Sequence, residues 1–411
     1  MKTSTYGPIS ERWDIHRLKN LCVPDGIQTG PFGSQLHQKD YLPVGTPIIT
    51  VEHLGENRIL HQDLPRISDK DRDRLSRYMM RKGDIIFSRV GSVDRRALVR
   101  NEEDGWLFSG RCLRVRPDST KIDQDFLSWF FGFEAFKDYI RRIAVGATMP
   151  SLNTEILSNV PIIVPPLPEQ HAIADVLGSL DDKIELNRRM NATLESMARA
   201  VFRQWFVESD DAKRWKVVPL PEVINVNPSR SLKKGVIAPY LDMANMPTQG
   251  HRGIEWIDRP FGSGTKFING DTLLARITPC LENGKTAFVD FLAEGQVGWG
   301  STEYIILRPK PPLPVEYGYY LARSEELRNH TIQNMTGTSG RQRAPASCFD
   351  KYMLAVPPEP LANQFGDFVR PIMAKIRSND EQSRTLAALR DALLPRLMSG
   401  EVRVKDVEKE Q

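Results

Sequence analysis

The chain has 411 residues, which exceeds the roughly 250 to 300 residues at which a single hydrophobic core stops growing, so two or more domains are expected. Hydrophobic residues make up 40% and charged residues 26%, an ordinary globular composition that excludes a fibrous or wholly disordered chain. The formal net charge of +4 is too small to identify a nucleic-acid-binding protein by itself.

The amino-terminal stretch MKTSTYGPISERW lacks the apolar core of a signal peptide, and no stretch approaches the roughly 18 apolar residues of a membrane span. Cys22, Cys112, Cys280 and Cys348 are scattered without a CxxC pair, which supports neither a zinc ribbon nor a disulfide framework. We therefore expect neither export nor membrane insertion, and a reducing cytoplasm fits best.

The first 164 residues have the pattern of a β-rich domain. After a start marked by Trp13 and Leu18, short apolar runs alternate with glycine and proline turns, among them KGDIIFSRVG at 82–91 and CLRVRP at 112–117. A long helix is predicted after the proline pair at 165–166. Mostly apolar residues recur in steps of four and three, the a/d seam of a coiled coil, at Ile173, Leu177, Leu180, Ile184, Asn187, Asn191, Leu194, Ala198, Val201 and Trp205.

The second half of the chain repeats the first. Residues 165–184 align without a gap on residues 357–376, at an offset of 192 (357 minus 165). Upstream, Arg116-Pro117 corresponds to Arg308-Pro309, and NGDTLLARIT at 269–278 resembles 82–91. The seam recurs at Phe365, Val369, Ile372, Ile376, Asn379, Ser383, Leu386, Arg390, Leu393 and Leu397.

Both copies place an asparagine in the middle of the seam, Asn187 and Asn379. A polar residue there costs stability but can fix the register and the partner of a coiled coil, although a solvated helix middle would also place one there. Pro371 and Pro395 interrupt the second copy, so a kink or a late start is predicted for that helix, which should be the less regular of the two.

Motifs that would indicate catalysis are missing. The sequence around Asn283-Gly284-Lys285-Thr286 has Pro279 where a phosphate-binding loop needs glycine. The seven histidines form no HExxH pair and have no neighbour at zinc-ligand spacing, so no metal is expected. The chain also lacks a GxSxG elbow, a dinucleotide fingerprint and the Asn-Pro-Pro-aromatic tetrapeptide of adenine methyltransferases, so no catalytic residue is predicted.

Basic and amide side chains in glycine-bounded turns have the chemistry that reads DNA, because arginine pairs with guanine and asparagine or glutamine with adenine. The same residues are also ordinary surface residues. The cluster 341–343 is the strongest candidate, and its counterpart at 146–153 is neutral, so the halves should read different sequences. The DNA-binding candidates are Ser34, Gln35, Arg89, Arg95, Arg96, Thr148, Asn153, Arg276, Asn283, Lys285, Arg341, Gln342 and Arg343.

Residues 165–207, beginning PPLPEQHAIADVLGSL, resemble the central conserved region of type I restriction-modification specificity subunits, and RDALLPRLMSGEVRV at 390–404 resembles their distal conserved region. GPFGSQL at 30–36 and the strands led by Gly83-Asp84 and Gly270-Asp271 resemble their target-recognition domains.

The resemblance implies an α+β fold with pseudo-twofold symmetry, in which two β-rich domains are each followed by a long helix and the helices pack as an antiparallel coiled coil. The expected segments are target-recognition domain 1 at 1–164, the central spacer helix at 165–208, target-recognition domain 2 at 209–356, and the distal spacer helix and tail at 357–411.

The resemblance also implies a non-catalytic subunit that recognises two DNA half-sites separated by a fixed gap. Its expected partners are double-stranded DNA, two modification subunits that bring S-adenosylmethionine and methylate adenine, and restriction subunits that use ATP and Mg²⁺. Two alternatives stay open at this point. One is an autonomous nuclease or methyltransferase with a divergent site, and the other is an adaptor whose coiled coil binds protein and whose β domains bind no DNA.

Overall fold

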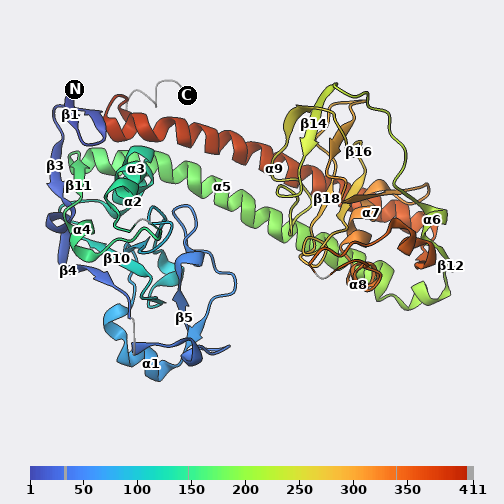
Figure 1. The fold of residues 1–411 in the computed structure, drawn as a ribbon, viewed down its shortest axis with the longest axis horizontal. Coiled ribbons are helices and arrows are strands. Elements are labelled where there is room, and N and C mark those ends of the chain that lie inside the picture. The colour runs from blue at the N-terminus through green and yellow to red at the C-terminus, as the bar shows by residue number, and fades with distance from the viewer. Residues whose placement is uncertain (32–34, 147, 339, 405–411) are drawn as a thin grey trace. The chain divides into compact units, whose positions relative to one another are not determined.

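A computed structural model (Figure 1) describes residues 1–31, 35–146, 148–338 and 340–404. It separates into two compact units, of which unit 1 comprises Met1–Ile184 and Thr385–Gln411 and unit 2 comprises Glu185–Arg384. Each unit therefore contains one β-rich domain and a part of both long helices, α5 (Leu167–Phe202) and α9 (Glu359–Ser399). Across the described residues, no helix is both long and apolar enough to cross a membrane.

Unit 1 is built around a four-stranded antiparallel sheet of order β4-β10-β7-β8 and a three-stranded sheet of order β6-β5-β9, in which β5 and β9 run parallel. Two two-stranded sheets, β1-β2 and β11-β3, complete it. The strands are β1 (Lys2–Ser4), β2 (Gly7–Ile9), β3 (Asp14–Arg17), β4 (Cys22–Thr29), β5 (Thr46–Ile49), β6 (Arg66–Ile67), β7 (Ile85–Ser88), β8 (Arg96–Leu98), β9 (Leu107–Phe108), β10 (Cys112–Pro117) and β11 (Pro161–Val164). The shorter helices are α1 (Asp69–Arg74), α2 (Gln124–Gly132), α3 (Glu134–Ile143) and α4 (Thr154–Ser158).

Unit 2 repeats the main sheets of unit 1. Its sheet β13-β20-β17-β18 matches β4-β10-β7-β8 strand for strand, and β12-β21 matches β3-β11. A further sheet, β15-β14-β19-β16, again contains a parallel pair, β14 with β19. The strands are β12 (Lys216–Pro219), β13 (Ile224–Val226), β14 (Ile237–Leu241), β15 (Ile257–Pro260), β16 (Thr265–Phe267), β17 (Thr272–Ala275), β18 (Thr286–Phe288), β19 (Gly298–Gly300), β20 (Tyr304–Pro309) and β21 (Met353–Val356). The shorter helices are α6 (Leu220–Val223), α7 (Val315–Ala322) and α8 (Glu325–Gln333).

The repeated Gly-Asp and Arg-Pro motifs meet inside each unit. In unit 1, Arg116 donates from Nε to Oδ1 and from Nη2 to Oδ2 of the buried Asp84, both at 2.7 Å. In unit 2, Arg308 donates to Asp271 at 2.8 Å. In both units the glycine before the aspartate has a left-handed backbone, with a φ of 87° at Gly83. Other residues rarely adopt this conformation. These motifs therefore hold the central sheet together.

The seam packs antiparallel within each unit. In unit 1, Ile173 and Leu177 of α5 share a core with Leu393 and Leu397 of α9. In unit 2, later residues of α5 contact earlier residues of α9, as Phe202 does with Phe365 at a ring distance of 5.6 Å. The predicted α+β class with antiparallel helices is confirmed.

The two seam asparagines hydrogen-bond across the helix pair inside unit 2. Asn187 is fully buried and donates from Nδ2 to Gln382 at 2.9 Å and to Ser383 at 3.2 Å. Asn379 is 2% exposed and donates to Oδ1 of Asn191 at 2.8 Å. Because these donors have partners only in this alignment of the helices, a shift along the seam would leave them unpaired.

The expected late start of the second long helix is wrong. α9 begins at Glu359 and continues past both prolines, whereas α5 ends in a π-helical turn at Arg203–Val207. Pro371 and Pro395 lie on the exposed side of α9. Proline has no amide N–H, so the carbonyl groups four residues earlier, those of Asp367 and Asp391, have no helical partner. Both residues are exposed, and their carbonyl groups can accept hydrogen bonds from water.

Candidate nucleic-acid interface

In unit 2, the segment after β17 and the hairpin at 336–343 lie side by side. Ile277 and Thr336 each form an antiparallel bridge with Arg343. The amide of Thr278 donates to the carbonyl of Gln342 at 3.0 Å, and the amide of Ala344 donates to the carbonyl of Arg276 at 2.8 Å. Four predicted residues, at 276 and 341–343, are thus brought together.

The charged side chains of this cluster have different surroundings. Arg343 donates from Nε to Glu303 at 2.8 Å, and Nε of Arg276 lies 4.0 Å from the same carboxylate group. Arg341 is exposed, and among the described residues no ion pair or side-chain hydrogen bond of its guanidinium is found. A phosphate or a base edge could therefore be contacted by Arg341 without first breaking an internal contact.

The neighbouring turn contains one more accessible candidate. Asn283 is exposed at the turn between β17 and β18. Lys285, in contrast, donates to the carbonyl oxygens of Met243 at 2.6 Å and Ala244 at 3.3 Å. The ammonium group of Lys285 is thus occupied by hydrogen bonds to the backbone of the adjacent loop. This indicates a structural role for Lys285 rather than a DNA contact.

Unit 1 repeats the arrangement with other side chains. Val90 and Val145 each bridge Ser151, the amide of Gly91 donates to Pro150 at 2.9 Å, and the amide of Leu152 donates to Arg89 at 2.8 Å. This hairpin occupies the place of 336–343, as the repeat predicts. Its tip contains the exposed Thr148 and no charged residue.

The three arginines proposed after β7 face inward to different degrees. Arg89 is half-buried and donates to the carbonyl of Gly110, and Arg95 donates to the carbonyl of Leu54. Arg96 is only 1% exposed, donates to Glu56 at 2.7 Å and to the carbonyl of Ser128 at 3.1 Å, and packs against α2. Protein encloses Arg96, so we do not retain it as a DNA contact.

The remaining candidates of unit 1 lie in two loops. Oε1 of Gln35 accepts from Tyr78 at 2.9 Å, which fixes the position of this exposed side chain. Asn153 caps α4, because its Oδ1 accepts the amide of Ile156 at 2.7 Å. Ser34 lies outside the described residues. The structure thus separates accessible candidates, Thr148, Asn283 and Arg341, from residues that hold the scaffold.

Sequence patterns missed a groove in unit 1 that encloses about 1090 Å³ beside β4 and β10. Its lining includes three arginines that belong to none of the predicted DNA-reading turns, Arg77, Arg81 and Arg114. No sequence signal pointed to this groove, because Arg114, with an apolar residue on either side, fits the alternation of a strand with one side facing solvent. Burial lowers the pKa of Arg114 to about 10, and the neighbouring Arg116 adds to this effect.

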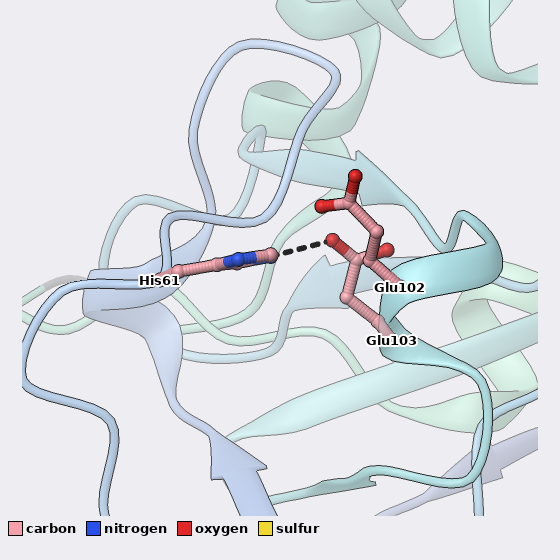
Figure 2. Close-up of side chains that lie close together, drawn as sticks. All are labelled: His61, Glu102 and Glu103. Atoms are coloured by element: carbon pink, nitrogen blue, oxygen red, sulfur yellow. Dashed lines mark hydrogen bonds and ion pairs between the residues drawn. The ribbon is translucent and has the colours of Figure 1, made fainter. Parts of the chain in front are cut away.

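One group of possible metal ligands is found in the part of the chain that the structure describes. Ligand atoms of His61, Glu102 and Glu103 all lie within 4.8 Å of one another (Figure 2). Nε2 of His61 lies 2.6 Å from Oε1 of Glu103, whose Oε2 accepts the amide of Arg100 at 2.7 Å. Both oxygens of the buried Glu103 thus have protein partners, and the group is explained as a structural His-Glu pair.

A buried ion cluster joins two arginines outside the strands of unit 1, Arg58 and Arg100, to both long helices. Asp181 of α5 is 5% exposed and accepts from Nε of Arg58 at 2.9 Å. It also accepts from Arg390 of α9 at 3.0 Å, and Arg100 lies 3.8 Å away. The exposed neighbour Asp182 accepts from Arg58 at 2.7 Å.

Unit 2 has a buried charge cluster with a histidine at its centre. His251 is fully buried, with Nδ1 3.6 Å from Glu195 of α5 and Nε2 3.5 Å from Asp290. Tyr319 of α7 donates to Glu195 at 2.6 Å. Burial opposes the charged imidazole, but the two carboxylates outweigh it and raise the pKa of His251.

Residues 11–196 match the family model of the type I restriction modification DNA specificity domain. The whole chain is similar to the specificity subunit of the type I restriction enzyme MjaIX from Methanocaldococcus jannaschii, with 23% identity over 99% of this chain and 97% of the relative. It is 30% identical to the specificity subunit of the HindI enzyme from Haemophilus influenzae, over 38% of this chain and 34% of the relative.

The fold is similar to a solved structure. The crystal structure of the S subunit of a type I restriction-modification system from M. genitalium superposes with a TM-score of 0.60, covering 95% of this chain and 96% of the other at 15% identity. At that identity the likeness shows the fold alone.

Proposed function

Because this chain belongs to the family of type I restriction-modification specificity subunits, we propose that it recognises a bipartite DNA site, with one half-site read by each unit. The family assigns DNA sequence recognition without catalysis to the chain. The division into two half-sites is our proposal, and it rests on the duplicated interface.

The observation that carries this proposal is the pairing of the same two loops in both units with different side chains. The bridge of Val90 to Ser151 in unit 1 corresponds to that of Ile277 to Arg343 in unit 2. The backbone frame is therefore repeated, whereas the hairpin tip is neutral in one unit and contains Arg341 in the other. Different side chains on one frame read different base sequences.

The proposed partners are those that membership of this family implies. We propose that modification subunits supply S-adenosylmethionine and transfer the methyl group to adenine, and that restriction subunits supply ATP-driven translocation and cleavage with Mg²⁺. The long helices provide the surfaces on which these subunits assemble. This chain positions them on the DNA.

Methylome sequencing of a host that carries this chain with its modification partner tests the proposal. We expect methylated adenines in one motif that consists of two short defined sequences and a gap of constant length. A contiguous motif without a gap, or methylation that does not depend on this chain, would contradict it. The same experiment returns the bases that each unit reads.

Arg341→Ala should weaken binding to the cognate duplex by about 1 to 3 kcal/mol if the guanidinium reads a base. The loss should be confined to DNA that carries the half-site of unit 2, because a base contact discriminates between sequences. Fluorescence anisotropy with cognate and scrambled duplexes measures both values. Arg12→Ala, which removes one exposed arginine outside the candidate loops, is the matched control. An equal loss on all duplexes would instead indicate a phosphate contact.

Asn187→Leu combined with Asn379→Leu should leave the chain folded but relax the gap length between the half-sites. Leucine suits the seam, yet it removes the hydrogen bonds that fix the register. Methylome sequencing should then show motifs with more than one gap length. Leu194→Met, an apolar seam substitution, should keep a single gap, and the idea fails if the double variant does so as well.

A further inference from the structure

The groove beside β4 and β10 of unit 1 has an unusual buried cation. Arg114 lies in the middle of β10, is only 4% exposed and lines the groove. It donates to the carbonyl oxygens of Arg77 and Asp25, both at a long 3.3 Å, and its buried Nε has no hydrogen-bond partner. No carboxylate in the described chain forms an ion pair with it. A buried guanidinium without a counter-ion is costly, so an anion from outside would be bound strongly.

Two exposed cations add to the positive charge of the groove. Arg77 and Arg81 both line it, and no ion pair of either side chain occurs within the described ranges. A fourth arginine in the lining, Arg116, is neutralised by Asp84. Asp25 and Asp104 also line the groove, which leaves a small excess of positive charge concentrated around Arg114.

The groove adjoins the predicted recognition loops. Its lining includes Thr29, which precedes the GPFGSQL turn, and Thr154, which follows the hairpin at 145–153. Hydroxyl and amide groups at Gln28, Thr29, Ser76 and Thr154 provide neutral hydrogen-bonding groups between the arginines. Neutral donors next to guanidinium groups are typical of contacts to phosphate oxygens.

Unit 2 has a smaller basic pocket over the corresponding strands, lined by Arg230, Lys266 and Arg276. Ile306 occupies the position of Arg114, because both residues lie two positions before the Arg-Pro motif. The same place in the repeat is therefore basic in both units. At this position of the strand, unit 1 has a cation and unit 2 has an apolar side chain.

We propose that the groove of unit 1 holds phosphate groups of the DNA backbone, with Arg114 as the buried contact and Arg77 and Arg81 as contacts at the rim. This inference rests on the proposed function and deepens it. The groove orients the protein on the duplex, and the loops contact the bases. Unit 1, whose hairpin tip is neutral, thereby obtains the positive charge that its loop lacks.

The test is the salt dependence of DNA binding by the full chain, measured by fluorescence anisotropy on a random-sequence duplex. Each phosphate contact contributes roughly 0.9 to the slope of log affinity against log salt concentration. Arg77→Ala with Arg81→Ala should reduce the magnitude of that slope by about 2, and Arg114→Ile by about 1. The repeat itself folds with isoleucine at this position, which makes Arg114→Ile the mildest replacement.

Arg12→Ala with Lys19→Ala is the charge-matched control, because both residues are exposed and lie outside the lining. It should leave the slope close to that of the unsubstituted chain. If the groove variants keep the full slope while the unsubstituted chain binds DNA with a steep slope, the inference is overturned and the proposed function stands.

Two other outcomes also decide the matter. If the unsubstituted chain shows no salt-dependent DNA binding, the proposed function and the inference both fail. Titration with inorganic phosphate distinguishes the source of the anion. If the groove variants lose phosphate binding but keep the DNA slope, the groove takes a free anion and the backbone assignment is wrong. If Arg114→Ile does not fold by circular dichroism, the double variant of the exposed arginines decides alone.

Discussion

Asp181→Ala should lower the free energy of unfolding of unit 1 by about 3 to 5 kcal/mol, because removing one member of a buried ion cluster leaves the others uncompensated. The carboxylate of Asp181 is almost completely buried between Arg58 and Arg390. Without it, these two largely buried guanidinium groups are left with ion pairs to exposed carboxylates, those of Asp182 and Asp391. Urea denaturation followed by circular dichroism measures the loss.

The neighbouring carboxylate provides the control for this prediction. Asp182→Ala removes a contact with the same Arg58, but the side chain of Asp182 is 64% exposed. Exposed ion pairs contribute about 0 to 1 kcal/mol. If both substitutions destabilise the protein equally, burial of the cluster is not what stabilises unit 1.

Replacing the buried histidine should have a comparable effect in unit 2. His251→Gln leaves Glu195 and Asp290 without their shared cation, and we expect a loss of about 3 to 5 kcal/mol. Hydrogen exchange of peptides from 237–300, corrected for intrinsic rates, reports the local free energy of opening. His16→Asn, at an exposed position of unit 1, should leave that value unchanged.

The same cluster predicts a pH dependence with a defined sign. The pKa of His251 is raised in the folded protein, so its contribution to stability is complete below its ordinary pKa of 6.5 and is lost as pH rises through the higher folded value. The pKa values of Glu195 and Asp290 are lowered despite burial, because the imidazole of His251 lies between them, 3.6 Å from Glu195 and 3.5 Å from Asp290. Their contribution to stability is therefore lost at acidic pH.

Peptides from 237–300 should therefore become less protected above pH 6.5 in the unsubstituted chain. In His251→Gln this dependence should disappear, since no group titrates in that range at the same place. Protection that rises between pH 6.5 and 8 would show that His251 is neutral in the folded state.

The repeat and the helical seam could be predicted from the sequence because both are local patterns. The spacing of four and three residues places Leu177 and Phe365 on one buried side whatever the surroundings are. The parallel pairs β5-β9 and β14-β19 could not be predicted, because they join strands far apart in sequence through long connections. The predicted late start of α9 was wrong because the effect of a proline depends on whether it lies on the packed or the exposed side of the helix. That side is set by tertiary packing.

The candidate site was predicted in part for a similar reason. The loops follow from glycine spacing, and the structure brings the segments at 276 and 341–343 together. Whether an arginine in such a loop faces solvent, as Arg341 does, or lies buried under α2, as Arg96 does, depends on tertiary packing. Arg114 was missed because it belongs to a strand, and its groove is formed only when β4, β10 and the segment at 76–81 meet.

The central claim is that each unit reads its own half of the DNA site. It is tested most directly by methylome sequencing of a chimera in which residues 1–208 of this chain are fused to the second half of another family member. We expect one half of the methylated motif to stay that of this chain and the other half to change. An unchanged motif, or the simultaneous loss of both halves in a chimera that still methylates DNA, would contradict the account.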